Sequence, residues 1–321
     1  MHAAVLHKFG EAPRLEEYVE PVPGPGEVRV RVEAAAVKAL DRGLATGKHY
    51  ASPRTLPVVV GTDGVGRLDD GRRVFIVRTR APFGTMAEWT VAPAAACWPL
   101  PEGIDPLQAA AALNPGLSAW LGLEFRAGLV KGEAVVILGA TGTAGRLAVR
   151  IAKLLGAQQV VAVARDEAAL EELRSQGADA VISLRHAEEE VVEELARELQ
   201  ARNVTVAIDY LAGAPAELLF RALARSQPPT PEGTWVRYVQ IGESAGSTLT
   251  VPPSLLRSHF VELTGIGLGT LPPPEVVARS AASLFGHLVR GELSVPLLRF
   301  PLAEVATAWA RSGSPRPVVV P

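Results

Sequence analysis

The sequence predicts an α/β fold of two domains, in which a doubly wound parallel sheet is inserted into a β-rich domain. Three observations support this prediction. Residues 134–165 form a strand–helix–strand unit, strands and helices alternate beyond it, and short apolar strands separated by Gly and Pro fill both ends of the chain. A chain of 321 residues also exceeds what one hydrophobic core usually supports.

The strand–helix–strand unit is defined by its apolar pattern. Residues 134–138 are all apolar, which predicts a strand buried on both faces. Residues 147–155 carry Leu and Ile at helical spacing, and Gly156 ends the predicted helix. A second buried strand is expected at 160–163. The unit therefore has the order found at the start of a parallel nucleotide-binding sheet.

Three glycines, Gly139, Gly142 and Gly145, separate the first strand from the helix. The pyrophosphate of a dinucleotide must approach the amides at a helix N-terminus more closely than a Cβ allows. We expect Gly139 and Gly142 to form the turn and open this approach, and Gly145 to let the helix pack on the strand. Ala140 stands where the commoner G-x-G-x-x-G has its first glycine. The turn predicts a nucleotide site, and the alternative is a tight turn that binds nothing.

The end of the second strand indicates which dinucleotide binds. An NAD site normally has an acidic residue there, whereas NADP requires a cation for its 2′-phosphate. Here the strand ends in Arg165, and no carboxylate stands at 160–164. Arginine can bind a phosphate through two hydrogen bonds, so the sequence predicts NADP(H). The alternative is that Asp166 binds the ribose and Arg165 lies in solvent.

Short strands of an antiparallel barrel or sandwich are expected at 3–6, 27–35, 64–67, 73–77 and 85–91. A helix at 105–112 and the segment 115–128 lead into the nucleotide domain. There, helices are expected at 167–177, 188–199 and 216–225, strands at 180–183, 205–208, 235–241 and 262–266, and a loop at Pro228, Pro229 and Pro231. The C-terminal part predicts helices at 278–290 and 303–311 and strands at 299–302 and 318–320. Because it resembles the first domain in character, we expect the nucleotide domain to be an insertion.

Composition excludes several classes of partner. A net charge of −2 and the lack of a basic cluster argue against nucleic acid. No run of about 18 apolar residues and no signal-peptide pattern occur, so we expect no membrane span and a cytoplasmic location. Cys97 is the only cysteine, which excludes an internal disulfide and a zinc site of four cysteines.

The order of these parts and several short segments resemble the medium-chain dehydrogenase/reductase superfamily, specifically its zinc-independent quinone oxidoreductase branch. The segments are 36–41, 61–66, 84–91, 114–120 and 139–145, with Gly177-Ala178-Asp179. The resemblance spans essentially the whole chain. It implies a GroES-like catalytic domain at 1–117 and 290–321, a Rossmann NADP-binding domain at 118–289, NADPH use, and an oligomer that we expect to be a homodimer.

The resemblance also implies that no metal takes part. Zinc-dependent alcohol dehydrogenases of the superfamily have Gly-His-Glu where this chain has Gly61-Thr62-Asp63, and a ligand cysteine near Val37-Lys38. The six histidines show no pair at ligand spacing. Alcohol oxidation without zinc would lack its Lewis acid.

Hydride transfer to a quinone or an α,β-unsaturated carbonyl needs only hydrogen-bond donors at the carbonyl oxygen. We therefore expect an NADPH-dependent quinone or enone reductase. The alternatives are an enoyl-thioester reductase and a non-catalytic NADPH-binding protein.

Candidate site residues follow from the same resemblance. Tyr50 matches a tyrosine near the nicotinamide, and its phenol would donate to the substrate; the alternative is a loop tyrosine that packs on a neighbour. Lys38 stands where many relatives have asparagine. Its side chain would be an electrophilic donor or a phosphate contact, and the alternative is a solvated surface lysine. Asn114 would orient the nicotinamide amide or cap the helix after Pro115. Asp41 is expected to cap the segment 42–46.

In the cofactor domain the expected contacts are Thr141, Gly142, Thr143 and Ala144 at the pyrophosphate, with Leu211, Gly242, Gly265 and Gly267 along the riboses. For each of these glycines the alternative is turn geometry alone.

Overall fold

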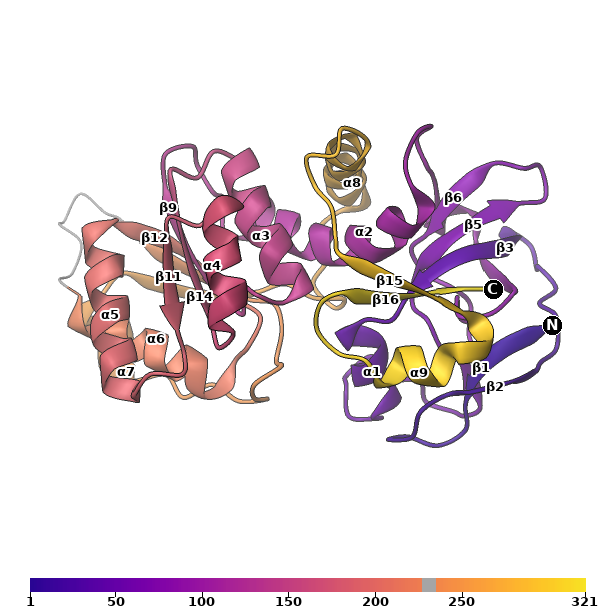
Figure 1. Ribbon diagram of the computed structural model, residues 1–321, viewed down its shortest axis with the longest axis horizontal. Coiled ribbons are helices and arrows are strands. Elements are labelled where there is room, and N and C mark those ends of the chain that lie inside the picture. Colours follow the sequence, from indigo (N-terminus) through magenta and orange to yellow (C-terminus); the bar gives the residue numbers. More distant parts are fainter. Residues whose placement is uncertain (227–234) are drawn as a thin grey trace. The chain divides into compact units, whose positions relative to one another are not determined.

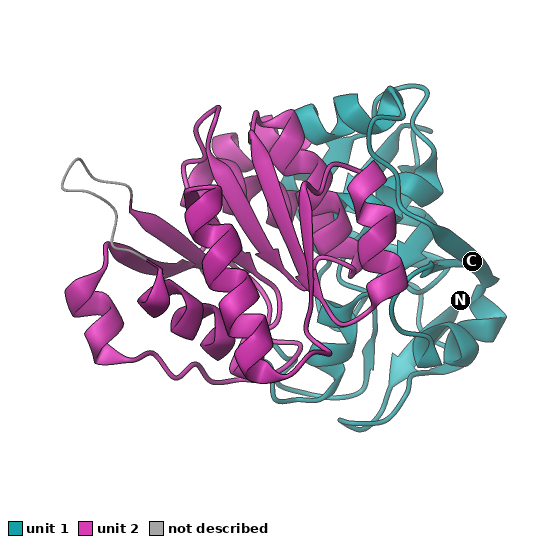
Figure 2. Cartoon of the chain, turned by 60° about the vertical axis from the view of Figure 1, so that its left-hand side comes forward, with its two compact units in different colours: residues 1–114, 282–321 teal, residues 115–281 magenta. Residues whose placement is uncertain are grey.

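The computed structural model describes residues 1–226 and 235–321 (Figure 1). Contacts within the chain divide it into two compact units (Figure 2). Unit 1 comprises residues 1–114 and 282–321, and unit 2 comprises residues 115–281. The first boundary falls inside helix α2 (Pro106–Trp120), and the second falls inside α8 (Pro274–Val289). The sequence had placed the second boundary at the end of α8.

Unit 2 is built on a six-stranded parallel sheet with the strand order β11-β10-β9-β12-β13-β14. Its strands are β9 (Ala134–Leu138), β10 (Gln159–Ala164), β11 (Ala180–Ser183), β12 (Val204–Asp209), β13 (Val236–Gln240) and β14 (Val261–Gly265). The chain runs outward from β9 to β11 and then returns to place β12 on the other side of β9. This confirms the predicted doubly wound sheet, and its topological switch point lies between β9 and β12.

The helices of unit 2 follow the strands in the predicted alternation. They are α3 (Thr143–Leu154), α4 (Glu167–Ser175), α5 (Glu188–Ala201) and α6 (Gly213–Arg225). The short helix α7 (Pro253–Ser258), between β13 and β14, was not predicted, and a π-helical segment, η2 (Leu121–Arg126), continues from α2. The acidic helix α5 buries its apolar stripe in the core of the sheet. The negative charges of its first-turn glutamates interact favourably with the positive end of the helix dipole. It is therefore an amphipathic helix, as its spacing predicts.

Unit 1 is a mainly antiparallel β structure. Its strands are β1 (His2–Leu6), β2 (Arg14–Glu17), β3 (Glu27–Ala36), β4 (Val58–Val59), β5 (Gly64–Leu68), β6 (Arg73–Ile76), β7 (Trp89–Pro93), β8 (Cys97–Pro99), β15 (Leu297–Pro301) and β16 (Arg316–Val320). One sheet has the order β15-β16-β3-β5-β6-β8, with β7 also paired to β3, and a smaller one has the order β2-β1-β4. The long strand β3 is the centre of this unit.

The C-terminal segment completes unit 1. Strand β16 pairs antiparallel with β3, with Val318 opposite Ala36. The core beneath it joins apolar residues from β1, β3 and β16 with the short helix α9 (Val305–Ala310), which follows a 3₁₀ turn, η3 (Leu302–Glu304). Figure 1 shows the yellow end of the chain beside the indigo N-terminal strands. The β-rich domain is therefore interrupted by unit 2, as predicted.

Two local predictions differ from the structure, and a third cannot be compared with it. The strand expected at 85–91 begins only at Trp89, because the amides of Thr85 and Met86 donate to Gly61 and Val60 and not to β3, which pairs with the strand from Trp89 onward. The helix expected at 105–112 continues to Trp120 through Pro115. The proline-rich loop falls outside the described residues. No helix in the described ranges is both long and apolar enough to cross a bilayer.

Candidate functional site

The predicted cofactor residues all follow the carboxyl ends of parallel strands. The glycine turn follows β9, Arg165 follows β10, Leu211 follows β12, and Gly242 and Gly267 follow β13 and β14. Carboxyl ends of parallel strands meet at one edge of a sheet, so the fold brings these residues to the same edge. The glycine turn and Leu211 flank the switch point between β9 and β12, where ligands of such sheets bind.

The three glycines of the turn meet different demands. Gly139 has a positive φ of 81°, which strains any L side chain. A Cβ on Gly145 would lie 2.2 Å from the carbonyl oxygen of Gly139, so this position must be glycine for α3 to pack. Gly142 has an ordinary φ of −70°, is exposed, and a Cβ there would be no closer than 3.4 Å to a neighbouring atom.

Packing within the chain therefore does not require a glycine at 142. Gly142 is the N-cap of α3, and its exposed backbone leads directly into the first turn of that helix, which includes Thr143 and Ala144. A helix N-terminus attracts anions through its amides and its dipole. This arrangement fits a phosphate group that approaches the backbone where a side chain would otherwise stand.

Leu211 lies against Gly139 of the glycine turn, and Gly242 lies against Tyr210, the residue before Leu211. A Cβ on Gly139 would be 3.0 Å from a methyl carbon of Leu211, and one on Gly242 would be 2.6 Å from the carbonyl oxygen of Tyr210. Gly265 ends β14, and Gly267 exchanges hydrogen bonds of 3.0 and 3.1 Å with Thr270. The roles of these residues in the site stay a prediction.

The cation at the end of β10 has a neighbour that sequence reasoning missed. Arg165 is exposed, and the Nε of Arg185, also exposed, donates a hydrogen bond of 2.8 Å to its carbonyl oxygen. Asp166 is the N-cap of α4 and accepts from the amide of Ala169 at 3.1 Å. Two guanidinium groups thus lie near this strand end, while the carboxylate that was the alternative ribose ligand caps a helix.

Arg185 could have been found by aligning the ends of neighbouring strands. β10 and β11 pair in parallel with Ala164 opposite Ser183, so the residues after both strands share one edge of the sheet. A cation two positions beyond β11 therefore lies close to one just beyond β10.

Lys38 is buried in unit 1, with 2% of its surface exposed. Its ammonium lies 3.1 Å from Oδ2 of Asp41 and 3.2 Å from Oδ1 of Asp63, and it donates to the carbonyl oxygen of Ala36 at 3.2 Å. The prediction of a solvated surface lysine is therefore wrong. The ammonium donates to Ala36 and faces two carboxylate oxygens, so a phosphate or a substrate would have to compete with these three oxygen atoms.

The surroundings keep this lysine charged. Burial alone would lower the pKa of Lys38, but the carboxylates of Asp41 and Asp63 outweigh it, and the pKa is raised. Burial raises the pKa of Asp63 even though Lys38 opposes that shift. Burial also lowers the pKa of nearby Arg316 to about 10, against the attraction of both carboxylates. We call Lys38, Asp41, Asp63 and Arg316 the buried charge cluster.

The buried charge cluster ties α1 (Ala39–Ala45) to the start of β5. Oδ2 of Asp41 accepts from the amide of Lys38 at 2.9 Å, and Oδ1 accepts from the amide and hydroxyl of Thr62 at 3.0 Å each. Asp41 therefore caps a helix, but that helix begins at Ala39 and not at Arg42. Asp41 is its third residue, and the carboxylate reaches back to the amide of Lys38, the N-cap.

Two further predicted residues have mixed outcomes. Tyr50 is 70% exposed in the turn after α1, with its ring stacked on His49 at 4.2 Å between centroids. Asn114 lies inside α2, so the alternative that it caps a helix starting after Pro115 is wrong. The helix simply runs through both residues. Contacts of Tyr50 and Asn114 with a substrate or a nicotinamide stay predictions.

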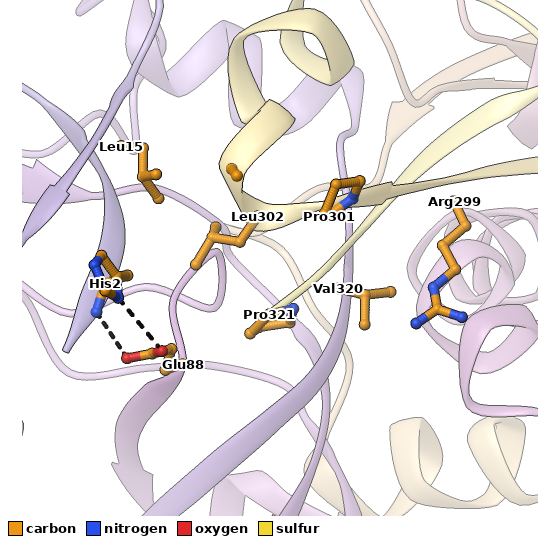
Figure 3. A pocket seen from close by; sticks show the side chains of 9 residues that line it. His2, Leu15, Glu88, Arg299, Pro301, Leu302, Val320 and Pro321 are labelled. Carbon is orange, nitrogen blue, oxygen red and sulfur yellow. Dashed lines mark hydrogen bonds and ion pairs between the residues drawn. The ribbon is translucent and has the colours of Figure 1, made fainter.

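A surface hollow of about 640 Å³ in unit 1 contains none of these residues (Figure 3). His2 and Glu88 are paired at one end, where the amide of His2 donates to the carboxylate at 2.8 Å, and Arg299 lies at the other end. Leu302 and Val320 line the apolar part between them. No predicted site residue points into this hollow, so it is not part of the candidate site.

Comparison with known proteins decides the family. Residues 144–226 match a family model described as zinc-binding dehydrogenase. A quinone oxidoreductase of Sus scrofa is 31% identical over 225 residues, which cover 66% of this chain and 67% of that protein. The chain belongs to the quinone oxidoreductase branch of the medium-chain dehydrogenase/reductase superfamily. This confirms the family expected from the motifs.

Other members and relatives agree with this assignment. The solved quinone oxidoreductase of Thermus thermophilus is 28% identical, with a TM-score of 0.81 and full coverage of both chains. A mycocerosic acid synthase-like polyketide synthase of Mycobacterium tuberculosis is 29% identical over 300 residues, 89% of this chain. The chain spans 13% of the length of that synthase.

The residues of this chain do not fit a catalytic zinc. The matched family model covers part of unit 2, whereas the zinc ligands of the superfamily would stand near Lys38 and Asp63 in unit 1. There, an ammonium already lies between the carboxylates, and it would repel a divalent cation. Within residues 1–226 and 235–321, no three His, Cys, Asp or Glu side chains are grouped to hold a metal.

Proposed function

We propose that this protein is a zinc-independent oxidoreductase that reduces a quinone or an α,β-unsaturated carbonyl with NADPH. The observation that carries the proposal is the ammonium of Lys38, which stands between two carboxylates where zinc enzymes of the superfamily place their metal. Without a Lewis acid, the chemistry that remains accessible is reduction of an acceptor that is already electron-poor. Membership of the quinone oxidoreductase branch supports the same acceptor class.

The glycine turn and the two arginines fit NADPH. The backbone at Gly142 and the N-terminus of α3 would hold the pyrophosphate, and Arg165 with Arg185 would bind the 2′-phosphate. The related Thermus thermophilus enzyme is described in complex with NADPH. When bound, this coenzyme supplies the hydride.

The protein's own part in the reaction is to orient and to donate. In this proposal the phenol of Tyr50 donates a hydrogen bond to the acceptor oxygen, where negative charge grows during reduction. Asn114 orients the nicotinamide amide. Lys38 was predicted to act there too, but here we propose a structural part for it, because its ammonium faces three oxygen atoms within unit 1.

Replacing Tyr50 with phenylalanine should lower kcat by about 10-fold to 100-fold, because one donor to the developing oxyanion is lost. The Kd for NADPH should stay within about twofold, since the phenol does not touch the coenzyme's phosphates. Steady-state kinetics with a quinone and a fluorescence titration with NADPH measure the two quantities. Tyr18→Phe, elsewhere in unit 1, is the matched control. An unchanged kcat in Tyr50→Phe would remove this residue from the mechanism.

Prolonged treatment with EDTA should leave the rate of NADPH oxidation unchanged, because the buried charge cluster offers no place for a divalent cation. The measurement is the initial rate before and after dialysis, alongside the zinc content of the protein. A rate that falls with EDTA and returns with added zinc would overturn the metal-free proposal.

We also propose a homodimer formed through β14. This strand ends the order of the described sheet, so one side of its backbone lacks a strand partner in that order. Trp235 and Phe260 lie beside its start, 51% and 39% exposed, with ring centroids 5.3 Å apart. Pairing of two such edges about a two-fold axis would cover both. Light scattering should give twice the chain mass of 33.8 kDa, and a monomer mass at micromolar concentration would reject the dimer.

Two expectations stay as predictions of the sequence alone. A cytoplasmic location rests on the absence of targeting patterns. Enoyl thioesters are the alternative acceptors. Comparing the rates of NADPH oxidation with quinones and with enoyl thioesters distinguishes a quinone reductase from an enoyl-thioester reductase.

A further inference from the structure

Two buried side chains and one half-buried side chain form a hydrogen-bonded chain beside the loops that carry Leu211 and Gly242. Asp209 is the last residue of β12 and has no exposed surface. Tyr238 and Gln240 lie beside it on β13, whose residues pair in parallel with those of β12. The phenol of Tyr238 contacts the carboxyl Oδ2 of Asp209 and lies 2.5 Å from Oε1 of Gln240. We call these three residues the Asp209 chain.

The Asp209 chain holds backbone that the cofactor site uses. Oδ1 of Asp209 accepts from the amide of Leu211 at 2.6 Å, and the carboxyl group also accepts from Ala212 at 3.1 and 3.2 Å. Ala212 has a positive φ of 57°, which a residue with a side chain rarely adopts. The amide nitrogen of Gln240 donates to the carbonyl oxygen of Gly242.

A count of protons shows what the Asp209 chain requires. The phenol of Tyr238 has one proton but faces two acceptor oxygens, one on Asp209 and one on Gln240. Turning the amide of Gln240 over would set its oxygen against the carbonyl oxygen of Gly242, so that oxygen must face the phenol. If Asp209 were ionised, one of the two contacts of the phenol would join two oxygens with no proton between them.

A protonated Asp209 satisfies every contact. Its Oδ2–H then donates to the phenol oxygen of Tyr238, the phenol donates to Oε1 of Gln240, and Nε2 of Gln240 donates to Gly242. Oδ1 remains an acceptor for the amide of Leu211. All donors in the Asp209 chain then have an acceptor.

The surroundings favour the neutral acid. Within the described residues, no Lys, Arg or His forms an ion pair with Asp209, and the residue opposite it on β9 is Leu138. The titratable side chains nearest in sequence are Tyr210, directly after Asp209, and Glu243, which is exposed on the loop after β13. Burial raises the pKa of Asp209, while hydrogen bonds from Tyr238 and from the amides of Leu211 and Ala212 oppose that shift. The pKa of Tyr238 is itself raised by burial, so the phenol keeps its proton.

We propose that Asp209 is a carboxylic acid at neutral pH and that, through Tyr238 and Gln240, it is a positioning residue for the coenzyme. The positioning half of this inference rests on the proposed function. Ionisation of Asp209 would draw the single proton of the phenol to the carboxylate, break the link between Tyr238 and Gln240, and so release the carbonyl of Gly242. Affinity for NADPH should therefore fall as the pH rises through the raised pKa of Asp209.

The protonation state is tested without any coenzyme. The infrared spectrum of the wild-type protein at neutral pH should contain the carbonyl stretching band of a buried carboxylic acid. This band should be absent from the spectrum of Asp209→Asn. Asp63→Asn is the matched control, because Asp63 is a second buried acid with a raised pKa, and this variant should keep the band. Tyr238→Phe should shift the band, since the acid loses its acceptor. Absence of any band that depends on Asp209 or on Tyr238 would overturn the proposal.

Coenzyme binding tests the positioning. An asparagine at 209 keeps the acceptor for Leu211 and presents an N–H to Tyr238, so Asp209→Asn should bind NADPH within about twofold of wild type and lose the fall in affinity at alkaline pH. Tyr238→Phe should raise the Kd about 10-fold, as an unsatisfied buried polar group does, with kcat at saturating NADPH unchanged. Tyr210→Phe is the control and should keep the wild-type pH profile.

The two tests fail separately. A tenfold weaker Kd in Asp209→Asn, with Tyr238→Phe unaffected, would overturn the positioning role. If the wild-type protein bound no NADPH at all, the proposed function would fail while the infrared result would still decide the protonation of Asp209.

Discussion

Replacing Lys38 with methionine should lower the free energy of unfolding by about 3–5 kcal/mol. Methionine keeps the length and apolar character of the side chain but removes the ammonium that lies within 3.2 Å of Asp41 and Asp63. Two buried carboxylates would then have only Arg316 as a counter-charge, and a buried charge that is poorly compensated is among the most destabilising changes in a protein. Urea unfolding of both proteins, followed by circular dichroism, measures the difference.

The control for this prediction is Lys48→Met. Lys48 is exposed, so this substitution should change the free energy of unfolding by no more than about 0.5 kcal/mol. A second replacement should separate charge from packing. Lys38→Met combined with Asp63→Asn should be more stable than Lys38→Met alone, because one of the two stranded charges is gone. If Lys38→Met and Lys48→Met unfold at the same urea concentration, the ammonium is not the counter-charge of the buried charge cluster.

The pH dependence of the Lys38→Met variant has a definite sign. Burial already raises the pKa of Asp63 while Lys38 is present, and removal of the ammonium raises it further. A carboxyl group with a raised pKa in the folded state destabilises the fold above that pKa and does so less as the pH falls through it. The gap in stability between the variant and the wild type should therefore narrow from neutral toward acidic pH.

Replacing Arg165 with alanine should raise the Kd for NADPH about 10-fold to 100-fold and leave that for NADH nearly unchanged. A hydrogen bond to a charged group contributes about 1.5–3 kcal/mol, and only NADPH carries the 2′-phosphate that this guanidinium would bind. Arg185→Ala should act in the same direction, since its guanidinium donates to the backbone of Arg165. Titration of each variant with both coenzymes measures the selectivity.

Arg174→Ala, on the exposed face of α4, is the control and should change neither Kd. Equal weakening of NADPH and NADH by Arg165→Ala would reject the assignment of a 2′-phosphate site to this end of β10.

The parts of the fold that depend on local pattern could be predicted from the sequence. The glycine turn and the apolar strands around it predict the doubly wound sheet, because strand, turn and helix signals lie within one short segment at 134–165. The apolar stripe of α5 likewise follows from spacing alone. Pro115 misleads because proline is normally a helix breaker, yet here α2 continues through it.

Tertiary contacts decided what the sequence left open. Lys38 is buried because Asp63, which follows a different strand in the chain, supplies a second carboxylate, and no local pattern around Lys38 indicates that pairing. Arg185 becomes a neighbour of Arg165 only when the ends of the two predicted strands are aligned as parallel partners, and no pattern local to Arg165 indicates this. The Asp209 chain also joins two strands, so the proton count at Tyr238 appears only when both are placed side by side.

The most direct measurement of the central claim is the loss of reduced-nicotinamide absorbance when zinc-free protein is mixed with NADPH and an acceptor. Quinones and α,β-unsaturated ketones form one panel, and enoyl thioesters form the other. We expect turnover with the first panel, faster than with the second, at a rate that added zinc does not change. Binding of NADPH without oxidation by any acceptor, or turnover that appears only when zinc is added, would contradict the account.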